Sequence, residues 1–197
     1  DLLGVEIARE GKLVTMRQKG YIERMAQEQL SEKELETVVR APCDEKLEQR
    51  VDAASSLDMS TIDPALVRQY QGLVGALLYA SINTRPDIAF AVGQLSRVTA
   101  RHTPEILEDA KRVLAYLYHT RDLGLCYQAD RRQTSGMTDS NWATRHSTSG
   151  WVFQFGCAAV AWASKKQKTV ALSSCEAEIM AASEASKEAM YLKQHME

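Results

Sequence analysis

The chain is poor in the residues that build disulfide or zinc frameworks. Its four cysteines, Cys43, Cys126, Cys157 and Cys175, are far apart in the 197-residue sequence, and no two of them form a Cys-x-x-Cys pair. This spacing argues against a structural zinc site and against a disulfide framework. No apolar run approaches the ~20 residues of a membrane-spanning helix, so we expect no membrane partner. The formal net charge of -2 gives no overall attraction to nucleic acid, and any such binding must come from local basic clusters.

Aspartate is absent from the sequence after Asp139. Asp139 lies in a short strand-like run and Glu176 opens a helix-like stretch, and carboxylates are the side chains that hard divalent cations prefer. A site for two Mg²⁺ ions about 4 Å apart needs several carboxylate ligands, more than these two residues provide. The first residue, Asp1, also stands within a strand-like pattern. We therefore expect a piece of a longer enzyme, whose site is incomplete in this chain.

Helical patterns dominate the first two thirds of the sequence after an opening hairpin. Asp63 and Pro64 supply an N-cap and a first-turn proline to the clearest amphipathic helix. Thr103 and Pro104 do the same for a later helix. The patterns predict a hairpin over 2–16, helices over 20–30, 64–78, 88–96 and 104–117, and a connecting stretch with one short helix over 31–62.

Strand patterns replace helical ones after Gly124. Short apolar runs between turn-forming residues predict strands at 125–127, 137–139, 151–155 and 159–162, and apolar spacing over 177–192 predicts a final helix. Trp142, Trp151 and Trp162 are expected to fill the core between this sheet and the helix. The predicted fold class is α+β, with a small helical bundle followed by an antiparallel sheet and a helix.

Several motifs follow one another in an order that points to a known family. The run at 138–143 is Thr-Asp-Ser-Asn-Trp-Ala, 147–150 is Ser-Thr-Ser-Gly, 162–167 is Trp-Ala-Ser-Lys-Lys-Gln, and 170–178 is Val-Ala-Leu-Ser-Ser-Cys-Glu-Ala-Glu. Together they resemble the ribonuclease H region of copia-type LTR-retrotransposon Pol polyproteins. Upstream, 70–80 and 84–88 resemble the segment that joins reverse transcriptase to ribonuclease H, and 3–7 is similar to the last palm hairpin of the polymerase. Asn141 departs from the pattern, because the family often has a second aspartate there.

The resemblance implies three parts in this chain. Residues 1–62 would be the end of reverse transcriptase, 63–122 a thumb- or connection-like helical bundle, and 123–197 a partial, truncated ribonuclease H-like domain. The parent protein would copy RNA into DNA and hydrolyse the RNA strand of RNA/DNA hybrids. The aspartate pair of the polymerase would lie before Asp1 and the later aspartates of the nuclease after Glu197, so we expect the isolated chain to be inactive.

Asp139 and Glu176 are the catalytic and metal-binding residues that the resemblance implies. Asp139 would lie at the centre of the first strand and bridge two Mg²⁺ or Mn²⁺ ions, while Glu176 would face it from the first long helix and hold one ion. The residues alone also permit two local roles. Ser173 and Glu176 fit a capping box, and Asp139 fits a turn aspartate that bonds its own backbone. Glu178 is the reserve candidate for the helix carboxylate.

The densest basic run lies between the last predicted strand and the site helix and comprises Lys165, Lys166 and Lys168. Its position favours contacts with substrate phosphates, and a solvated loop is an equally good interpretation. Arg145, which follows the strand of Asp139, is expected to contact the substrate backbone as well.

The partners that the resemblance implies are an RNA/DNA hybrid or another nucleic acid and the remainder of the Pol polyprotein. The expected location is a cytoplasmic virus-like particle of the element, or the nucleus. Three possibilities stay open at this point. The chain is either part of the enzyme, or a non-catalytic nucleic-acid-binding remnant, or a piece of a decayed element.

Overall fold

The computed structural model describes residues 3–57, 64–131, 133–142 and 146–196. Its elements in chain order are β1 (Glu6–Glu10), β2 (Leu13–Arg17), α1 (Lys19–Gln29), α2 (Glu32–Glu36), α3 (Leu47–Ser55), α4 (Pro64–Asn83), η2 (Pro86–Ile88), α5 (Ala89–Leu95), η3 (Ser96–Val98), α6 (Pro104–His119), β3 (Leu125–Gln128), β4 (Thr134–Asn141), β5 (Thr148–Phe155), β6 (Ala158–Lys166) and α7 (Ser174–Met196). The strands form two three-stranded sheets, with the orders β1-β2-β3 and β4-β5-β6. The predicted α+β class is confirmed.

The chain divides into two compact units. One comprises Asp1–Ala8 and Thr15–Gly124, and the other comprises Arg9–Val14 and Leu125–Glu197. The first unit is mainly helical, and the second contains the β4-β5-β6 sheet and α7. No helix among the described residues combines the length and the apolar character that a membrane span requires.

The core of the first unit is built by helices whose apolar residues recur at helical spacing. In α4, Leu73, Val74, Leu77 and Ala80 are buried on one face. The side chain of Thr103 accepts a hydrogen bond from the Ile106 N–H at 3.3 Å, so the predicted N-cap of α6 is confirmed. The other predicted N-cap, Asp63, lies outside the described residues.

The connecting stretch contains more structure than its sequence predicts. Two helices, α2 and α3, occupy the region for which one short helix was expected. Leu47, Val51 and Ala54 of α3 are buried and belong to the same apolar core as α1, α4 and α6. The charged residues between these three positions obscure the helical spacing of the apolar residues in the sequence. The helix is recognised only from the tertiary contacts that bury these apolar residues.

Arg85 ties the end of α4 to the end of α6. Its side chain is 1% exposed. The guanidinium donates to both carboxylate oxygens of Asp87, at 2.9 and 2.7 Å, and to the backbone carbonyl and the hydroxyl of Thr120, at 3.1 and 2.6 Å. It also lies over the ring of Tyr116, 5.5 Å from the centroid. A buried charge is tolerated when its donors are satisfied in this way, so the Thr-Arg-Pro-Asp segment has a structural role.

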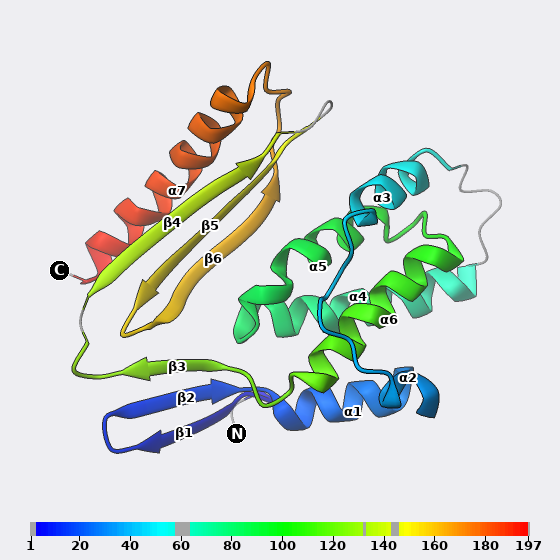
Figure 1. The fold of residues 1–197 in the computed structure, drawn as a ribbon, viewed down its shortest axis with the longest axis horizontal. Coiled ribbons are helices and arrows are strands. Elements are labelled where there is room, and N and C mark those ends of the chain that lie inside the picture. Colours follow the sequence, from blue (N-terminus) through cyan, green and yellow to red (C-terminus); the bar gives the residue numbers. More distant parts are fainter. Residues whose placement is uncertain (1–2, 58–63, 132, 143–145, 197) are drawn as a thin grey trace. The chain divides into compact units, whose positions relative to one another are not determined.

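The second unit carries the sheet on which the predicted nuclease residues lie. β4 pairs antiparallel with β5, and β5 pairs antiparallel with β6. The turn between β5 and β6 is formed by Gly156 and Cys157, which both have positive φ, 61° and 74°. Positive φ at both central residues is typical of a two-residue type I′ hairpin. Helix α7 packs against β4 and β5 and runs back along β4 (Figure 1).

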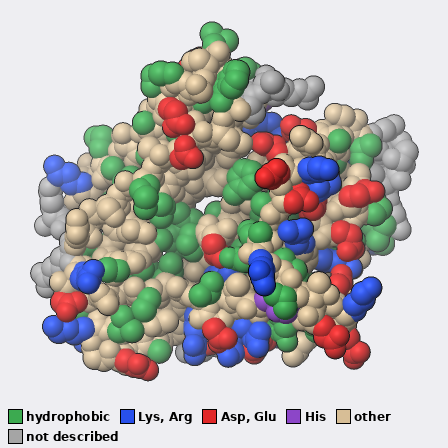
Figure 2. Space-filling view, viewed as in Figure 1, with side chains coloured by type: hydrophobic (Ala, Val, Ile, Leu, Met, Phe, Trp, Pro, Cys, Tyr) green, Lys and Arg blue, Asp and Glu red, His purple; other side chains and the backbone are tan. Residues whose placement is uncertain are grey.

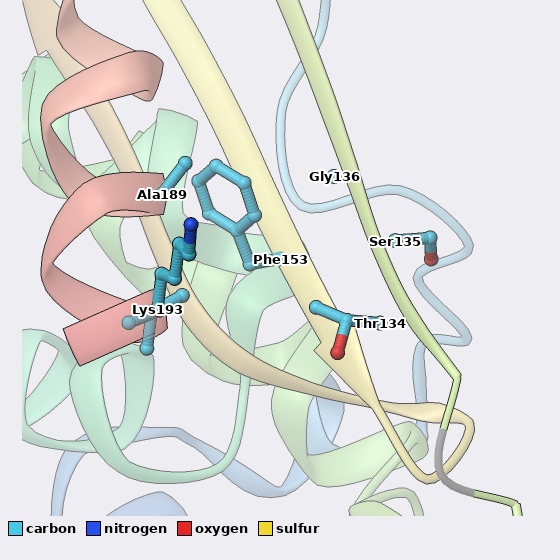
Figure 3. A pocket seen from close by; sticks show the side chains of 7 residues that line it. Thr134, Ser135, Gly136, Phe153, Ala189 and Lys193 are labelled. Atoms are coloured by element: carbon cyan, nitrogen blue, oxygen red, sulfur yellow. The ribbon is translucent and has the colours of Figure 1, made fainter. Parts of the chain in front are cut away.

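An apolar pocket separates part of α7 from this sheet. Its volume is about 320 Å³, and it is lined by Thr134, Ser135, Gly136, Phe153, Ala189, Leu192 and Lys193. The ring of Phe153 lies between β4 and Ala189 of α7 (Figure 3). Gly136 is the cross-strand partner of Phe153. A Cβ at position 136 would come within 2.4 Å of the Phe153 ring, so the glycine leaves the space that the ring fills.

Candidate functional site

Asp139 lies in β4, two positions before the strand ends at Asn141. Its cross-strand partner is Gly150 of β5, and its side chain is exposed. It makes no side-chain hydrogen bond or ion pair with the described residues, so the local turn role in which the carboxylate bonds its own backbone is not seen. The predicted strand is confirmed and is longer than expected, with Asp139 near its end rather than at its centre.

The face of the sheet that α7 covers is identified by two contacts. Phe153, the partner of Gly136, reaches the pocket beside Ala189 of α7. Ser149, the partner of Ser140, accepts a hydrogen bond from Gln167, whose amide also donates to the carbonyl of Ala177 in α7. Positions 136, 138 and 140 of β4 therefore face the helix.

Asp139 points away from that face, because successive side chains of a strand alternate between the two faces of a sheet. It shares the opposite face with Met137 and Asn141. The expectation that Glu176 faces Asp139 from the helix thus does not hold in the described register. The pairing of β4 with β5 is continuous from Thr134 to Asn141, with no bulge that would reverse the alternation.

Glu176 lies in the first turn of α7 and takes part in capping it. The Ser173 hydroxyl accepts from the Glu176 N–H at 3.2 Å, as the capping box predicts. The carboxylate accepts from the Leu172 N–H at 2.7 Å, one residue earlier than predicted. Leu172 itself is 86% exposed. Glu178, the reserve candidate, is exposed on another side of the helix.

The strand end that carries Asp139 and the helix start that carries Glu176 nevertheless lie at the same end of the second unit. Trp142, directly after β4, donates from its indole N–H to the carbonyl of Ala171, shortly before α7, at 3.3 Å. Among the described strands β4 is an edge strand with a single neighbour, β5.

The donor chemistry of these two residues suits a hard divalent cation, because Mg²⁺ and Mn²⁺ prefer carboxylate oxygens. One oxygen of Glu176 is engaged by a backbone N–H, and the Asp139 carboxylate contacts no described side chain. No group of three or more His, Cys, Asp or Glu side chains gathers among the residues that the structure describes. Asp139 and Glu176 would thus be two ligands of a site that needs more.

The basic run follows β6 as predicted. Lys165 and Lys166 end the strand, Lys168 follows it, and all three are exposed. An acidic residue of α7 lies close enough to interact with two of them. The Lys187 ammonium beside Glu184, with smaller contributions from Lys165 and Lys168, holds the pKa of that carboxyl below its usual value. Figure 2 shows Lys and Arg side chains interspersed with Asp and Glu. Arg145 lies outside the described residues.

Two polar residues near this end make contacts that the sequence did not predict. The side-chain oxygen of Asn141 accepts from the Thr148 N–H at 2.6 Å and joins the end of β4 to the start of β5. Gln167 is buried and bridges β5 and α7.

Trp142, expected in the core, is 56% exposed because it lies beyond the end of the strand. Trp151 and Trp162 are half-buried, on opposite faces of the sheet.

The sequence is similar to several transposon proteins. It is 42% identical over 132 residues to the retrovirus-related Pol polyprotein from transposon TNT 1-94 of Nicotiana tabacum, a match that covers 65% of this chain and 10% of that protein. It is 36% identical over 179 residues to a putative transposon Ty5-1 protein of Saccharomyces cerevisiae, covering 87% of this chain and 54% of that protein. The chain is thus related in sequence to retrovirus-related Pol polyproteins of transposons.

A third relative is not named as a transposon protein. The secreted RxLR effector protein 161 of Plasmopara viticola is 45% identical over 128 residues, and the match covers 62% of this chain and 90% of that protein. The chain thus spans most of one curated relative, about half of the yeast protein and a tenth of the tobacco polyprotein. No family model matches it. No solved structure matches it either.

Proposed function

We propose that this chain comes from the part of a retrotransposon Pol polyprotein that spans the end of reverse transcriptase and the start of ribonuclease H. The parent would copy RNA into DNA and hydrolyse the RNA strand of RNA/DNA hybrids. The observation that carries the proposal is the order β4-β5-β6-α7, with Asp139 on the first strand and Glu176 in the first turn of the helix. The similarity to transposon Pol polyproteins supports it.

Divalent cations, Mg²⁺ or Mn²⁺, are the cofactor of the proposed nuclease. When bound, such ions activate a water molecule and stabilise the leaving oxygen of the phosphodiester. Asp139 and Glu176 would hold them together with carboxylates from elsewhere in the polyprotein. Lys165, Lys166, Lys168 and Arg145 would contact the phosphates of the hybrid and fix its position without reading its sequence.

A second candidate is nucleic-acid binding without hydrolysis. One observation favours it for the chain by itself, because Asp139 points away from the face of β4 that α7 covers, and no group of three or more metal-binding side chains gathers among the described residues. The exposed lysines after β6 would then hold a duplex by charge alone. Such binding weakens steeply with salt, in proportion to the number of phosphates neutralised.

The experiment that tests the proposal compares the parent polyprotein with the isolated chain on a labelled RNA/DNA hybrid. The parent should release short RNA products with Mg²⁺ and none with EDTA. The isolated chain should leave the RNA intact. A parent preparation that extends a primer on RNA but never cleaves the hybrid would contradict the nuclease part of the proposal. Cleavage by the isolated chain would show that its site is complete.

A further inference from the structure

The side chain of Gln167 joins three segments of the second unit. Gln167 directly follows β6 and is 8% exposed. Its backbone N–H donates to the carbonyl of Ser147 at 2.8 Å. Its side-chain amide donates to the Ser149 hydroxyl in β5 and to the Ala177 carbonyl in α7, both at 2.9 Å. One buried amide therefore connects the end of β6, the start of β5 and the first turn of α7.

These contacts link the two backbone segments that carry the predicted nuclease residues. Ala177 is fully buried and directly follows Glu176. Ser149 is the cross-strand partner of Ser140, which directly follows Asp139. The amide thus links the helical turn that carries Glu176 to the strand pair that carries Asp139. The contacts of Glu176 with Leu172 and Ser173 are local and set only the shape of the turn.

A glutamine at this buried position is costly. The side-chain oxygen of Gln167 has no hydrogen-bond partner among the described residues, and neither does the buried hydroxyl of Ser140 nearby. A buried polar atom without a partner loses free energy that an apolar residue of similar size would not lose. Polar residues that break the rules of a packed core are concentrated at functional sites.

We infer that Gln167 is a positioning residue for Glu176. Its hydrogen bonds fix the first turn of α7 on the sheet, and they thereby fix the position of the Glu176 carboxylate relative to the end of β4. The inference rests on the proposed function, because it assigns a purpose to the position of Glu176. Residues that orient metal-binding side chains without touching the metal typically change metal affinity by roughly 10- to 100-fold when they are lost.

The test replaces Gln167 by methionine, which has a similar length and cannot donate a hydrogen bond. In the parent polyprotein, Gln167→Met should raise the Mg²⁺ concentration for half-maximal hybrid cleavage at least roughly 10-fold and leave the KM for the hybrid unchanged. In the 197-residue chain, hydrogen exchange should quicken at the amides of residues 172–178. Gln154→Met, in the same sheet but away from α7, is the matched control and should change neither quantity.

If Gln167→Met does not fold, Ser149→Ala removes one of the two acceptors and should produce a smaller change of the same kind. An unchanged Mg²⁺ dependence in a folded Gln167 or Ser149 variant would overturn the inference. Asp139→Asn and Glu176→Gln, assayed alongside, separate the two ideas. If both still cleave the hybrid, the proposed site itself is wrong, whereas loss of cleavage in both with a normal Gln167 variant leaves the site and rejects the positioning role.

Discussion

Gly136 and Phe153 face each other across β4 and β5, and the phenyl ring occupies the volume above the glycine. A Cβ at position 136 would lie 2.4 and 2.7 Å from two ring carbons. The ring also lines the pocket beside Ala189 of α7 (Figure 3). The absence of a side chain at position 136 therefore leaves the space that the Phe153 ring fills between the sheet and α7.

Gly136→Ala should destabilise the second unit, because the added methyl group displaces the Phe153 ring. Overpacking of this kind typically costs about 1 to 3 kcal/mol, and urea denaturation followed by circular dichroism measures it. Gly150→Ala is the control, since its added Cβ would meet only ordinary contacts, 3.9 Å from the Asp139 carbonyl oxygen. A Gly136→Ala chain as stable as Gly150→Ala would show that the ring moves without cost.

Arg85→Ala should destabilise the helical unit strongly. The substitution removes the buried donor of Asp87 and Thr120. Asp87 is 35% exposed and keeps the hydrogen bond from the Tyr116 hydroxyl, so the loss should cost roughly 1.5 to 3 kcal/mol, as for hydrogen bonds to charged groups. Arg68→Ala, at an exposed position of α4, should change the free energy of unfolding by less than about 0.5 kcal/mol. Equal stability of the two variants in thermal unfolding would contradict the structural role of Arg85.

The stability of the helical unit should fall between neutral and mildly acidic pH because of His102. Its ring stacks on Tyr70, with centroids 4.6 Å apart, and burial lowers the pKa of His102 below its usual value of about 6.5. The folded state thus favours the neutral ring. Its contribution is complete above about pH 6.5 and is lost as the pH falls toward the lowered pKa. Melting temperatures at pH 7.5 and 5 should differ less in His102→Phe, and an unchanged difference would reject the assignment.

Glu176→Ala should weaken the start of α7, because the Leu172 N–H loses its acceptor. Loss of a capping interaction typically costs about 1 kcal/mol. Glu178→Ala removes an equal charge two residues later, from an exposed side of the helix, and should cost less than about 0.5 kcal/mol. Hydrogen exchange at residues 172–178 of both variants distinguishes a cap at Glu176 from a general effect of charge at the helix start.

The sequence predicts the helices and strands better than it predicts how they pack against one another. The hairpin, α1, α4, α6 and the strands of the second unit follow from local periodicity and capping residues such as Thr103. Only one short helix was predicted over 31–62, where α2 and α3 both form, because the burial of Leu47 and Val51 depends on the core that other helices provide. Local sequence patterns predict helices and strands, but they do not show which residues are buried against distant segments of the chain.

The candidate site shows the same limit. Motif order places Asp139 on a strand and Glu176 at a helix start, and both placements are confirmed. Which face of β4 the helix covers depends on the pairing register and on contacts such as that of Gln167 with Ala177. A one-residue difference in register would reverse the direction of Asp139. No pattern within β4 determines that register.

Asp139→Asn in the parent polyprotein tests the central claim most directly. The substitution keeps the size of the side chain and removes its charge, so the proposed nuclease loses a metal ligand while the polymerase keeps its own. Release of RNA from a labelled RNA/DNA hybrid in Mg²⁺ should be abolished, and primer extension on an RNA template should continue at the normal rate. Undiminished cleavage of the hybrid by a folded Asp139→Asn polyprotein would contradict the account.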